Sequence, residues 1–369
     1  MKFVIDKNIP FISGVFESVA EVQYLSSQEI NNQTIKNADA LIIRTRTRCN
    51  EQLLKDTKVR FIATATAGSD HIDFDFCKKN NIEVAVAFGC NARSVAQYVG
   101  AAICFYTTRH CGLDPQSPLK SVIKKQGIAG QARNDEGLTI GIVGYGHVGK
   151  EVEKVAKLLN FNVLLNDPPL QKATGDKKFV SLQQIAENAD IITFHTPLTF
   201  DGEFPTKNFA DKVFFENLKH KPLIINTARG GVVDETELLK AYKNEKIADF
   251  VLDCWENEPK ISHELLQNAL IATPHIAGYS VDGKANATKI SVRAVAEFFN
   301  FDKLKNFEVI LPKNEKKCTD NKSVQALFFL RLFKLENYDI NFDSEKLKSN
   351  PENFEFFRNN YPERREIDY

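Results

Sequence analysis

Residues 138–149 read LTIGIVGYGHVG, an apolar run that passes directly into a glycine-rich turn. The apolar run is typical of a buried strand, and a helix is expected from the turn to about Asn160. At such a junction Gly144 permits the tight turn, Gly146 lets the backbone approach a pyrophosphate, and Gly149 lets the helix pack on the strand. The N-terminus of the helix also favours an anion. A GxGxxG pattern is weak evidence by itself, so its interpretation depends on the sequence around it.

An acidic residue stands at the end of the next expected strand. Asp167 follows the run NVLLN and lies 18 residues after Gly149. A carboxylate at this place accepts hydrogen bonds from an adenosine ribose and repels a 2′-phosphate. Strand, turn, helix and acid together therefore predict a dinucleotide site that takes NAD in preference to NADP.

The glycine turn belongs to a longer alternation of apolar runs and helical stretches. Runs this apolar are buried on both faces, so residues 138–282 are predicted to form a doubly wound parallel sheet with its helices. Residues 1–108 show the same rhythm and predict a second Rossmann-like parallel sheet of α/β class, completed by a helix at 283–299. The expected strands are residues 2–6, 38–47, 59–68 and 82–87 in the first sheet, and 138–146, 162–167, 189–197, 221–228, 248–253 and 269–274 in the second.

Two stretches depart from this alternation. Residues 109–137 carry turn formers throughout and are longer than most connections, so we expect an inserted linker, with a lid or partner-binding loop as the alternative. Residues 300–369 are richer in Lys, Asn and Phe and predict a small C-terminal α+β domain with helical segments at 323–335 and 351–360. Its phenylalanines suit either a subunit interface or an ordinary core.

Composition argues against several other classes of protein. The 48 Lys and Arg residues balance 48 Asp and Glu residues, so no overall charge attracts nucleic acid or an anionic membrane. No apolar run approaches the roughly 18 residues that span a bilayer, and the start MKFVIDKNIP lacks the apolar segment of a signal peptide, so a cytoplasmic protein is expected. The seven cysteines are scattered and never spaced C-x-x-C, so we expect reduced thiols and no metal site.

Polar clusters follow four of the later strands, at residues 195–197, 226–234, 253–259 and 273–279. Ligands of doubly wound sheets bind along the carboxyl ends of the strands, so these clusters are expected to converge on one crevice.

Oxidation of an alcohol needs a base, a cation beside the reacting oxygen and a hydride acceptor. We expect His275 to be the base, Arg229 the cation and Glu258 the carboxylate that orients the histidine. Each residue alone also fits a structural role. Their order along the chain, downstream of a dinucleotide turn, indicates a dehydrogenase.

Several strings resemble those of the D-isomer-specific 2-hydroxyacid dehydrogenases, in which Arg, Glu and His form the catalytic triad. The resemblance covers nearly the whole chain and is greatest to members of the family that oxidise 4-phospho-D-erythronate. The strings are TATAGSDHID (64–73), FGCNARSVAQYV (88–99), GYGHVG (144–149), NDPP (166–169), FHTPL (194–198), NTARGGVVD (226–234), LDCWENEP (252–259), HIAGYSVDGKANAT (275–288) and YPERRE (361–366).

The resemblance implies NAD-dependent oxidation of 4-phospho-D-erythronate to (R)-3-hydroxy-2-oxo-4-phosphooxybutanoate, in the synthesis of pyridoxal 5′-phosphate. It also implies a homodimer joined through the C-terminal domain. Another phosphorylated hydroxyacid such as 3-phosphoglycerate, or a non-catalytic NAD(H)-sensing scaffold, are the alternatives. The stretch 109–137 is longer than the family's link between domains.

The same resemblance assigns further residues. Thr45, Thr66 and Tyr279 would contact substrate. The cofactor contacts would be Gly144, Gly146, His147, Val148, Gly149, Asp167, Thr196, Thr227, Asp253 and Gly278.

The run RTRTR at residues 44–48 provides local positive charge for a phosphate. If it continues the strand, alternation points the three arginines to one side and Thr45 and Thr47 to the other. A substrate contact by Thr45 then conflicts with phosphate binding by the arginines, unless the strand has already ended. We expect at least one of Arg44, Arg46 and Arg48 to hold the phosphate, and Arg44 is counted among the substrate contacts.

Overall fold

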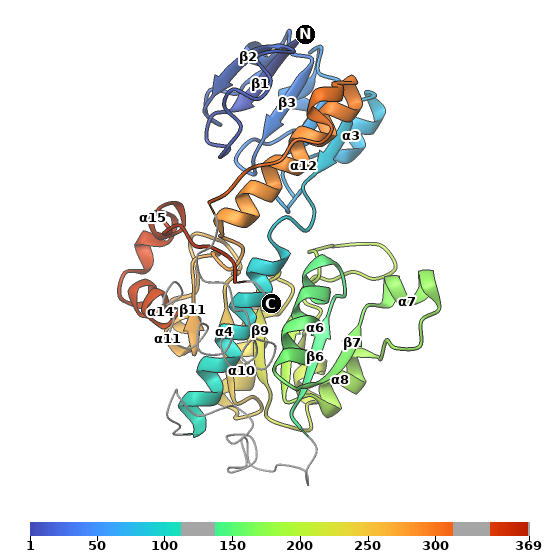
Figure 1. The fold of residues 1–369 in the computed structure, drawn as a ribbon. Coiled ribbons are helices and arrows are strands. Elements are labelled where there is room, and N and C mark those ends of the chain that lie inside the picture. Colours follow the sequence, from blue (N-terminus) through green and yellow to red (C-terminus); the bar gives the residue numbers. More distant parts are fainter. Residues whose placement is uncertain (112–136, 313–339, 368–369) are drawn as a thin grey trace. The chain divides into compact units, whose positions relative to one another are not determined.

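The computed structural model describes residues 1–111, 137–312 and 340–367. The chain forms two compact units (Figure 1). Unit 1 comprises Met1–Asn91 and Ser280–Glu315, and unit 2 comprises Ala92–Tyr279 and Lys316–Tyr369. Most of the expected linker and the expected helix at 323–335 lie outside the described residues.

Unit 1 contains a five-stranded parallel sheet with the order β2-β1-β3-β4-β5. Four of its strands lie where the sequence predicts them. The additional edge strand, EVQYL, was not predicted, because it is partly exposed and lacks an apolar run. The strands are β1 (Lys2–Asp6), β2 (Glu21–Leu25), β3 (Ala40–Ile43), β4 (Phe61–Thr64) and β5 (Glu83–Val86).

The helices of unit 1 include one from a distant part of the chain. Helix α12 (Val281–Phe299) packs against β4 and β5, and Figure 1 shows this orange helix beside the blue strands. The rings of Phe61 and Phe298 lie 4.6 Å apart between centroids. The other helical elements are α1 (Asn32–Ile35), α2 (Glu51–Leu54), α3 (Phe74–Lys79) and the short η1 (Asp302–Leu304).

Unit 2 contains the six parallel strands that the sequence predicts, in the order β11-β10-β9-β8-β6-β7. A bridge from Leu165 to Phe179 continues the sheet beyond β7. Because β7 and β8 lie on opposite sides of β6, the carboxyl end of β6 is a topological switch point, where such sheets bind ligands. The strands are β6 (Thr139–Val143), β7 (Asn162–Asn166), β8 (Ile191–Phe194), β9 (Leu223–Asn226), β10 (Asp249–Leu252) and β11 (Ile271–Ala272).

Helix α4 (Ala92–Cys111) belongs to unit 2, whereas the sequence analysis placed residues up to 108 in the first domain. It packs against α6 (His147–Leu158), and the Tyr98 hydroxyl lies 2.6 Å from the Thr273 hydroxyl. An amphipathic pattern predicts that a helix has a buried face but not which sheet it covers. The other helices of the unit before the C-terminal segment are α7 (Pro168–Thr174), α8 (Leu182–Asn188), α9 (Lys212–Glu216), α10 (Glu235–Lys243) and α11 (His263–Asn268).

The described C-terminal residues, 340–367, also belong to unit 2, whereas residues 300–312 belong to unit 1. This division differs from the separate domain 300–369 that the sequence suggests. Helix α14 (Ile340–Ser349) lies beside β11, where the Ser344 hydroxyl accepts a hydrogen bond from the Ala272 amide at 2.9 Å (Figure 1). The expected helical segment 351–360 is found as η2 (Pro351–Asn353) and α15 (Phe354–Asn359).

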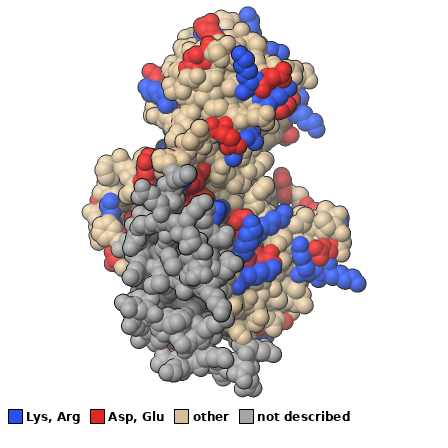
Figure 2. All heavy atoms as spheres, viewed as in Figure 1, with Lys and Arg blue, Asp and Glu red and all other residues tan. Residues whose placement is uncertain are grey.

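On the face drawn in Figure 2, basic and acidic side chains are interspersed over the described residues and form no large patch of one sign. No described helix combines the length and apolarity that crossing a membrane requires. Five cysteines among the described residues are buried and form no disulfide: Cys49, Cys77, Cys90, Cys104 and Cys254.

Candidate active site

The glycine turn after β6 has the geometry that a dinucleotide requires. Gly144 has a φ of +92°, and a Cβ there would lie 2.8 Å from the carbonyl carbon of His195. A Cβ at Gly149 would lie 2.1 Å from the Gly144 oxygen, whereas a Cβ at Gly146 would meet nothing within 4 Å. Gly146 is also the N-cap of α6 and supplies no side-chain cap, so the first-turn amides, including those of His147 and Val148, face an open space suited to a pyrophosphate.

Asp167 is fixed at the carboxyl end of β7, beside this turn. Its Oδ2 accepts a hydrogen bond from the Tyr145 amide at 2.8 Å, and its Oδ1 accepts one from the Leu170 amide at 2.9 Å. An ionised carboxylate has about four acceptor positions, so two contacts leave room for ribose hydroxyls.

A buried hydroxyl follows β8. The Oγ1 atom of Thr196 is buried without a hydrogen-bond partner among the described residues, and such groups usually await a ligand or water. Its neighbour His195 lies 2.9 Å from the Thr193 hydroxyl and 3.4 Å from the Thr227 hydroxyl, and burial lowers the pKa of His195 to about 3. His195 is therefore neutral, and the orphaned Thr196 hydroxyl fits the cofactor contact that the sequence predicts.

The charge of Asp167 can be tested through a ratio in which its structural contacts cancel. Asp167→Asn keeps a side-chain oxygen for the Leu170 amide but loses the acceptor of the Tyr145 amide, and that loss affects binding of NAD and NADP alike. We expect the ratio of kcat/KM with NAD to kcat/KM with NADP to fall by about 10-fold or more, because a 2′-phosphate would no longer meet a negative charge. Steady-state kinetics with both cofactors measures it, and an unchanged ratio would show that Asp167 does not face the ribose.

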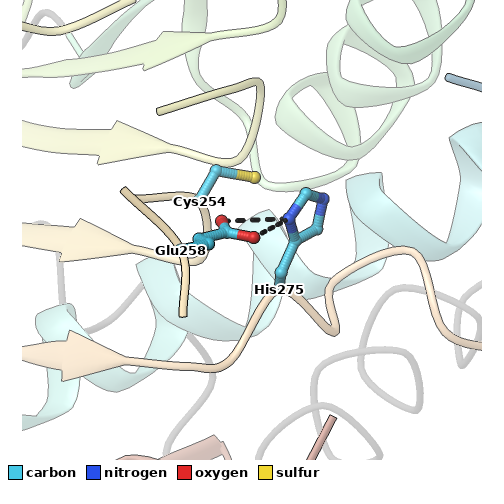
Figure 3. A group of neighbouring side chains, drawn as sticks. All are labelled: Cys254, Glu258 and His275. Carbon is cyan, nitrogen blue, oxygen red and sulfur yellow. Dashed lines mark hydrogen bonds and ion pairs between the residues drawn. The ribbon is translucent and has the colours of Figure 1, made fainter. Parts of the chain in front are cut away.

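Glu258 and His275 form a direct pair (Figure 3). The Nδ1 atom of His275 lies 3.1 Å from Oε1 and 3.0 Å from Oε2 of Glu258. The Trp255 amide donates to Oε1 at 3.0 Å. Burial raises the pKa of Glu258, but the hydrogen bond and charge of His275, the Trp255 amide and Arg358 outweigh it and leave that pKa below its ordinary value. Glu258 is therefore ionised at neutral pH.

His275 is presented by a loop that a buried acid holds in place. His275 follows β11 with a φ of +56°, an uncommon conformation for a residue with a side chain. Asp253, at the end of β10, accepts hydrogen bonds from the Ile276 amide at 2.7 Å and the Ala277 amide at 3.0 Å. It also accepts one from the Thr273 hydroxyl at 2.7 Å, so the residues on both sides of His275 are tied to the same carboxylate.

Asp253 is 1% exposed, and burial raises the pKa of its carboxyl group. Its hydrogen bonds show a role that the sequence analysis missed, namely orienting the loop that carries His275 and Gly278. Contact of Asp253 and Gly278 with NAD stays a prediction.

Arg229 lies in the loop after β9, which packs against the loop containing Glu258. The side-chain amide of Asn226 donates to the Arg229 oxygen at 2.9 Å, and a Cβ at Gly230 would lie 1.9 Å from the Trp255 oxygen. Burial raises the pKa of the Cys254 thiol well above its ordinary value; the charge of Glu258 adds to the effect and that of Arg229 opposes it. Arg229 and Glu258 thus act electrostatically on the same buried thiol.

The structure therefore brings the three loops that carry Arg229, Glu258 and His275 to the carboxyl ends of neighbouring strands, β9, β10 and β11. The ligand atoms of Cys254, Glu258 and His275 also lie within 4.8 Å of one another. The Cys254 thiol donates to the Ala228 oxygen at 3.4 Å, and Glu258 is engaged by His275. We assign no metal to this group.

Two residues near the pair were missed by sequence reasoning. Glu235 follows the NTARGGVVD string, and its Oε1 accepts a hydrogen bond from the Glu256 amide at 2.6 Å. Burial, with the charges of Glu256 and Glu258, raises the pKa of Glu235 to about 7. The second residue, Arg358, lies in α15 and has an ion-pair distance of 3.5 Å to Glu258. No sequence motif marks either one.

In unit 1, Thr66 lies just beyond β4 in a network of polar side chains. Its hydroxyl is 2.8 Å from the Thr64 hydroxyl and donates to the Gly68 oxygen at 3.1 Å. The Thr64 hydroxyl lies 3.1 Å from Nε2 of His71, and burial lowers the pKa of His71 to about 4. His71 is thus a neutral structural partner, and contact of Thr66 with substrate stays a prediction.

The arginine run does not continue the strand, and that part of the sequence prediction was wrong. Strand β3 ends at Ile43, and the Thr47 amide donates to the Arg44 oxygen at 3.1 Å, which closes a turn. Thr45 is exposed and Thr47 is buried, so the two do not share a face. Because the alternation has ended, the conflict between Thr45 and the arginines disappears.

Arg44 is already partly engaged, since its Nε atom lies 3.2 Å from Oδ2 of the buried Asp6. Arg46 and Arg48 are exposed. Phosphate binding by any of the three arginines, and substrate contact by Thr45, stay predictions.

Comparison with known proteins shows which family the chain is similar to. The family profile described as "D-isomer specific 2-hydroxyacid dehydrogenase, NAD binding domain" matches residues 119–277. The erythronate-4-phosphate dehydrogenase of Bacteroides thetaiotaomicron is 44% identical over 367 residues, which are 99% of this chain and 97% of the relative. The enzyme of the same name from Porphyromonas gingivalis is 36% identical over 368 residues, 100% of this chain and 94% of the relative.

Among solved structures, the D-lactate dehydrogenase of Aquifex aeolicus, complexed with NAD and lactic acid, has a TM-score of 0.63 and 24% identity. The match covers 85% of this chain and 100% of that one and supports the fold. The relatives, the matched NAD binding domain and the site together show that the chain belongs to the erythronate-4-phosphate dehydrogenases, within the D-isomer-specific 2-hydroxyacid dehydrogenase family.

Proposed function

We propose that this protein oxidises 4-phospho-D-erythronate at carbon 2 to (R)-3-hydroxy-2-oxo-4-phosphooxybutanoate with NAD, as a step in pyridoxal 5′-phosphate synthesis. The names of its full-length relatives, which are erythronate-4-phosphate dehydrogenases, support 4-phospho-D-erythronate as the substrate. The observation that supports the chemistry most directly is the hydrogen-bonded pair of Glu258 and His275, on loops beside the one that carries Arg229.

The pair determines which nitrogen of His275 acts as the base. An ionised carboxylate only accepts hydrogen bonds, so Nδ1 of His275 carries the proton that faces Glu258, and Nε2 has a free lone pair. Nε2 takes the proton of the substrate hydroxyl, and Glu258 stabilises the imidazolium that results.

The cofactor and Arg229 complete the oxidation. Bound NAD, held by the glycine turn, Asp167 and Thr196, would accept the hydride from carbon 2. Arg229 stabilises the oxygen that becomes a carbonyl and pairs with the substrate carboxylate. The products are the 2-oxo acid and NADH, and the proton on His275 passes to water.

The assay uses the purified full chain with NAD and follows NADH absorbance. We expect kcat/KM for 4-phospho-D-erythronate to exceed that for 3-phosphoglycerate by about 100-fold or more, because a site shaped for one acid leaves polar groups unpaired with another. Preference for 3-phosphoglycerate would indicate the related dehydrogenase activity. Tight NADH binding without turnover of either acid would indicate a sensing scaffold.

Assembly and location belong to the same proposal. A homodimer formed through the C-terminal residues is supported by the exposed rings of Phe342 on α14 and Phe356 on α15. Sedimentation at several concentrations tests it. A cytoplasmic location is supported by the sequence, in which no apolar run approaches the roughly 18 residues that span a bilayer.

A further inference from the structure

A partly buried cation from the C-terminal residues contacts the predicted catalytic pair. Arg358 lies in α15, 100 residues after Glu258, and its side chain is 21% exposed. Its Nη1 atom lies 3.5 Å from Oε2 of Glu258, and its Nε donates to the Tyr279 hydroxyl at 3.2 Å. Arg358 thus joins a residue of the pair to a residue expected to contact substrate.

Glu258 divides its acceptor positions between the two cationic partners and the backbone. The Trp255 amide occupies Oε1, whereas Oε2 lies near both Nδ1 of His275 and Nη1 of Arg358. A partly buried carboxylate is held in the ionised form by such neighbours. The nearby hydroxyl of Tyr279 and charge of Glu258 raise the pKa of Arg358 despite its burial, so the guanidinium is always charged.

The rest of the C-terminal segment fixes the position of Arg358. Arg364, which is 3% exposed, donates from Nε to the Tyr279 oxygen at 2.9 Å and from Nη2 to the Ala277 oxygen at 3.0 Å. Ser344 in α14 holds the end of β11 through the Ala272 amide. The backbone on both sides of His275 is therefore hydrogen-bonded to this segment, and Arg358 extends from the same segment to Glu258 and Tyr279.

We propose that Arg358 is a positioning residue of the active site, which holds the Glu258 carboxylate against His275 and orients Tyr279. The C-terminal segment, expected from the sequence to join two subunits, then also completes the site within its own chain. This inference rests on the proposed function, because it assigns His275 as the base.

Loss of this cation has two distinct consequences. Without Arg358, Glu258 has one partner fewer and its carboxylate can turn away from the imidazole. The Tyr279 hydroxyl also loses the donor at 3.2 Å that orients it. Both changes should lower the rate of the catalysed step, whereas loss of a purely structural contact would not act on that rate selectively.

The test compares Arg358→Met and Arg358→Lys in the full chain, with Lys346→Met as a control. Lys346 is another cation of the C-terminal segment, and it lies over the ring of Phe357 at 4.4 Å. We expect R358M to lower kcat by about 10- to 100-fold, the scale of a misplaced catalytic group. We also expect its NADH affinity to stay within about twofold of the wild type, because the contacts of Arg358 that carry the proposal are to Glu258 and Tyr279 and not to the glycine turn.

The lysine variant separates charge from geometry. R358K keeps the charge but not the forked contact, so its kcat should recover only in part. K346M should match the wild type in both measurements. A kcat of R358M within about twofold of the wild type would overturn the proposal, and so would a rise in substrate KM with unchanged kcat, which would indicate direct anion binding.

A second readout does not need turnover. The ring signal of His275 in an NMR spectrum is identified by its loss in His275→Asn, and its chemical shift at fixed pH should change in R358M but not in K346M, because the carboxylate beside Nδ1 is no longer held. If 4-phospho-D-erythronate is not oxidised but this change is seen, the substrate assignment fails and the positioning role stands. If turnover is normal and the chemical shift is unchanged, the positioning role fails alone.

Discussion

Replacing His275 by Asn is expected to lower kcat by about 1000-fold, the usual contribution of a general base. Asn can still donate a hydrogen bond towards Glu258 but cannot take the substrate proton at the position of Nε2. The affinity for NADH should change by less than about twofold, because most predicted cofactor residues lie on other loops, and Asp253 holds the backbone of the loop that carries Gly278. Turnover within about tenfold of the wild type would remove His275 from the reaction.

NADH affinity can be followed through the single tryptophan. Trp255 is 2% exposed, and its amide donates to Glu258, so its emission reports on the loop beside the pair. Unchanged emission at saturating NADH would place this loop away from the cofactor and weaken the assignment of Glu258.

Glu258→Gln is the matched variant for the histidine. An amide can present its NH₂ group to Nδ1, which favours the tautomer whose proton sits on Nε2 and leaves no lone pair for the substrate. We expect kcat to fall by about 100-fold or more with little change in NADH affinity. If E258Q and H275N together lower kcat no further than H275N alone, the two residues act as one unit.

Gly149→Ala is expected to have the largest effect on the cofactor site. Its Cβ would lie 2.1 Å from the Gly144 oxygen, so either the helix or the turn must move. We expect the free energy of unfolding to fall by about 1 to 3 kcal/mol, as in other overpacked sites. NADH affinity should fall by about 100-fold, since backbone amides displaced by an ångström no longer converge on a pyrophosphate.

Gly146→Ala is the control that separates folding from binding. No atom lies within 4 Å of its Cβ, so the protein should lose less than about 1 kcal/mol of stability. The added methyl group would occupy the space in which the pyrophosphate is expected, so NADH affinity should still fall strongly. Calorimetry or denaturant unfolding gives the stability, and Trp255 emission gives the affinity. Wild-type binding by G146A would contradict the placement of the cofactor.

Some features were predictable because they are local. The strand, turn and helix around Gly144 follow from apolar runs, glycine sterics and helix periodicity within a dozen residues. The six strands of unit 2 were found in the same way, and the carboxyl ends of parallel strands meet at one edge whatever lies between them. The pairing of Glu258 with His275 follows from their places after β10 and β11.

Other predictions failed where the evidence is not local. The arginine run after Ile43 has the composition of a strand, yet a turn closed by Thr47 ends the alternation, and the buried Asp6 takes the first arginine. Strand β2 carries too little apolar character to be found, because it lies at the edge of its sheet. In both cases the local pattern of side chains was too weak to show where a strand lies or where it ends.

The sequence by itself determined the six strands of unit 2, four of the five strands of unit 1, the dinucleotide turn and the three loops that bear Arg229, Glu258 and His275. Only the tertiary structure decided that α4 covers the sheet of unit 2, that the carboxylate of Asp253 fastens the loop of His275, and that Arg358 reaches Glu258. The physical reason is sequence separation. Backbone conformation follows from adjacent side chains, whereas a contact across 100 residues depends on how the whole chain packs.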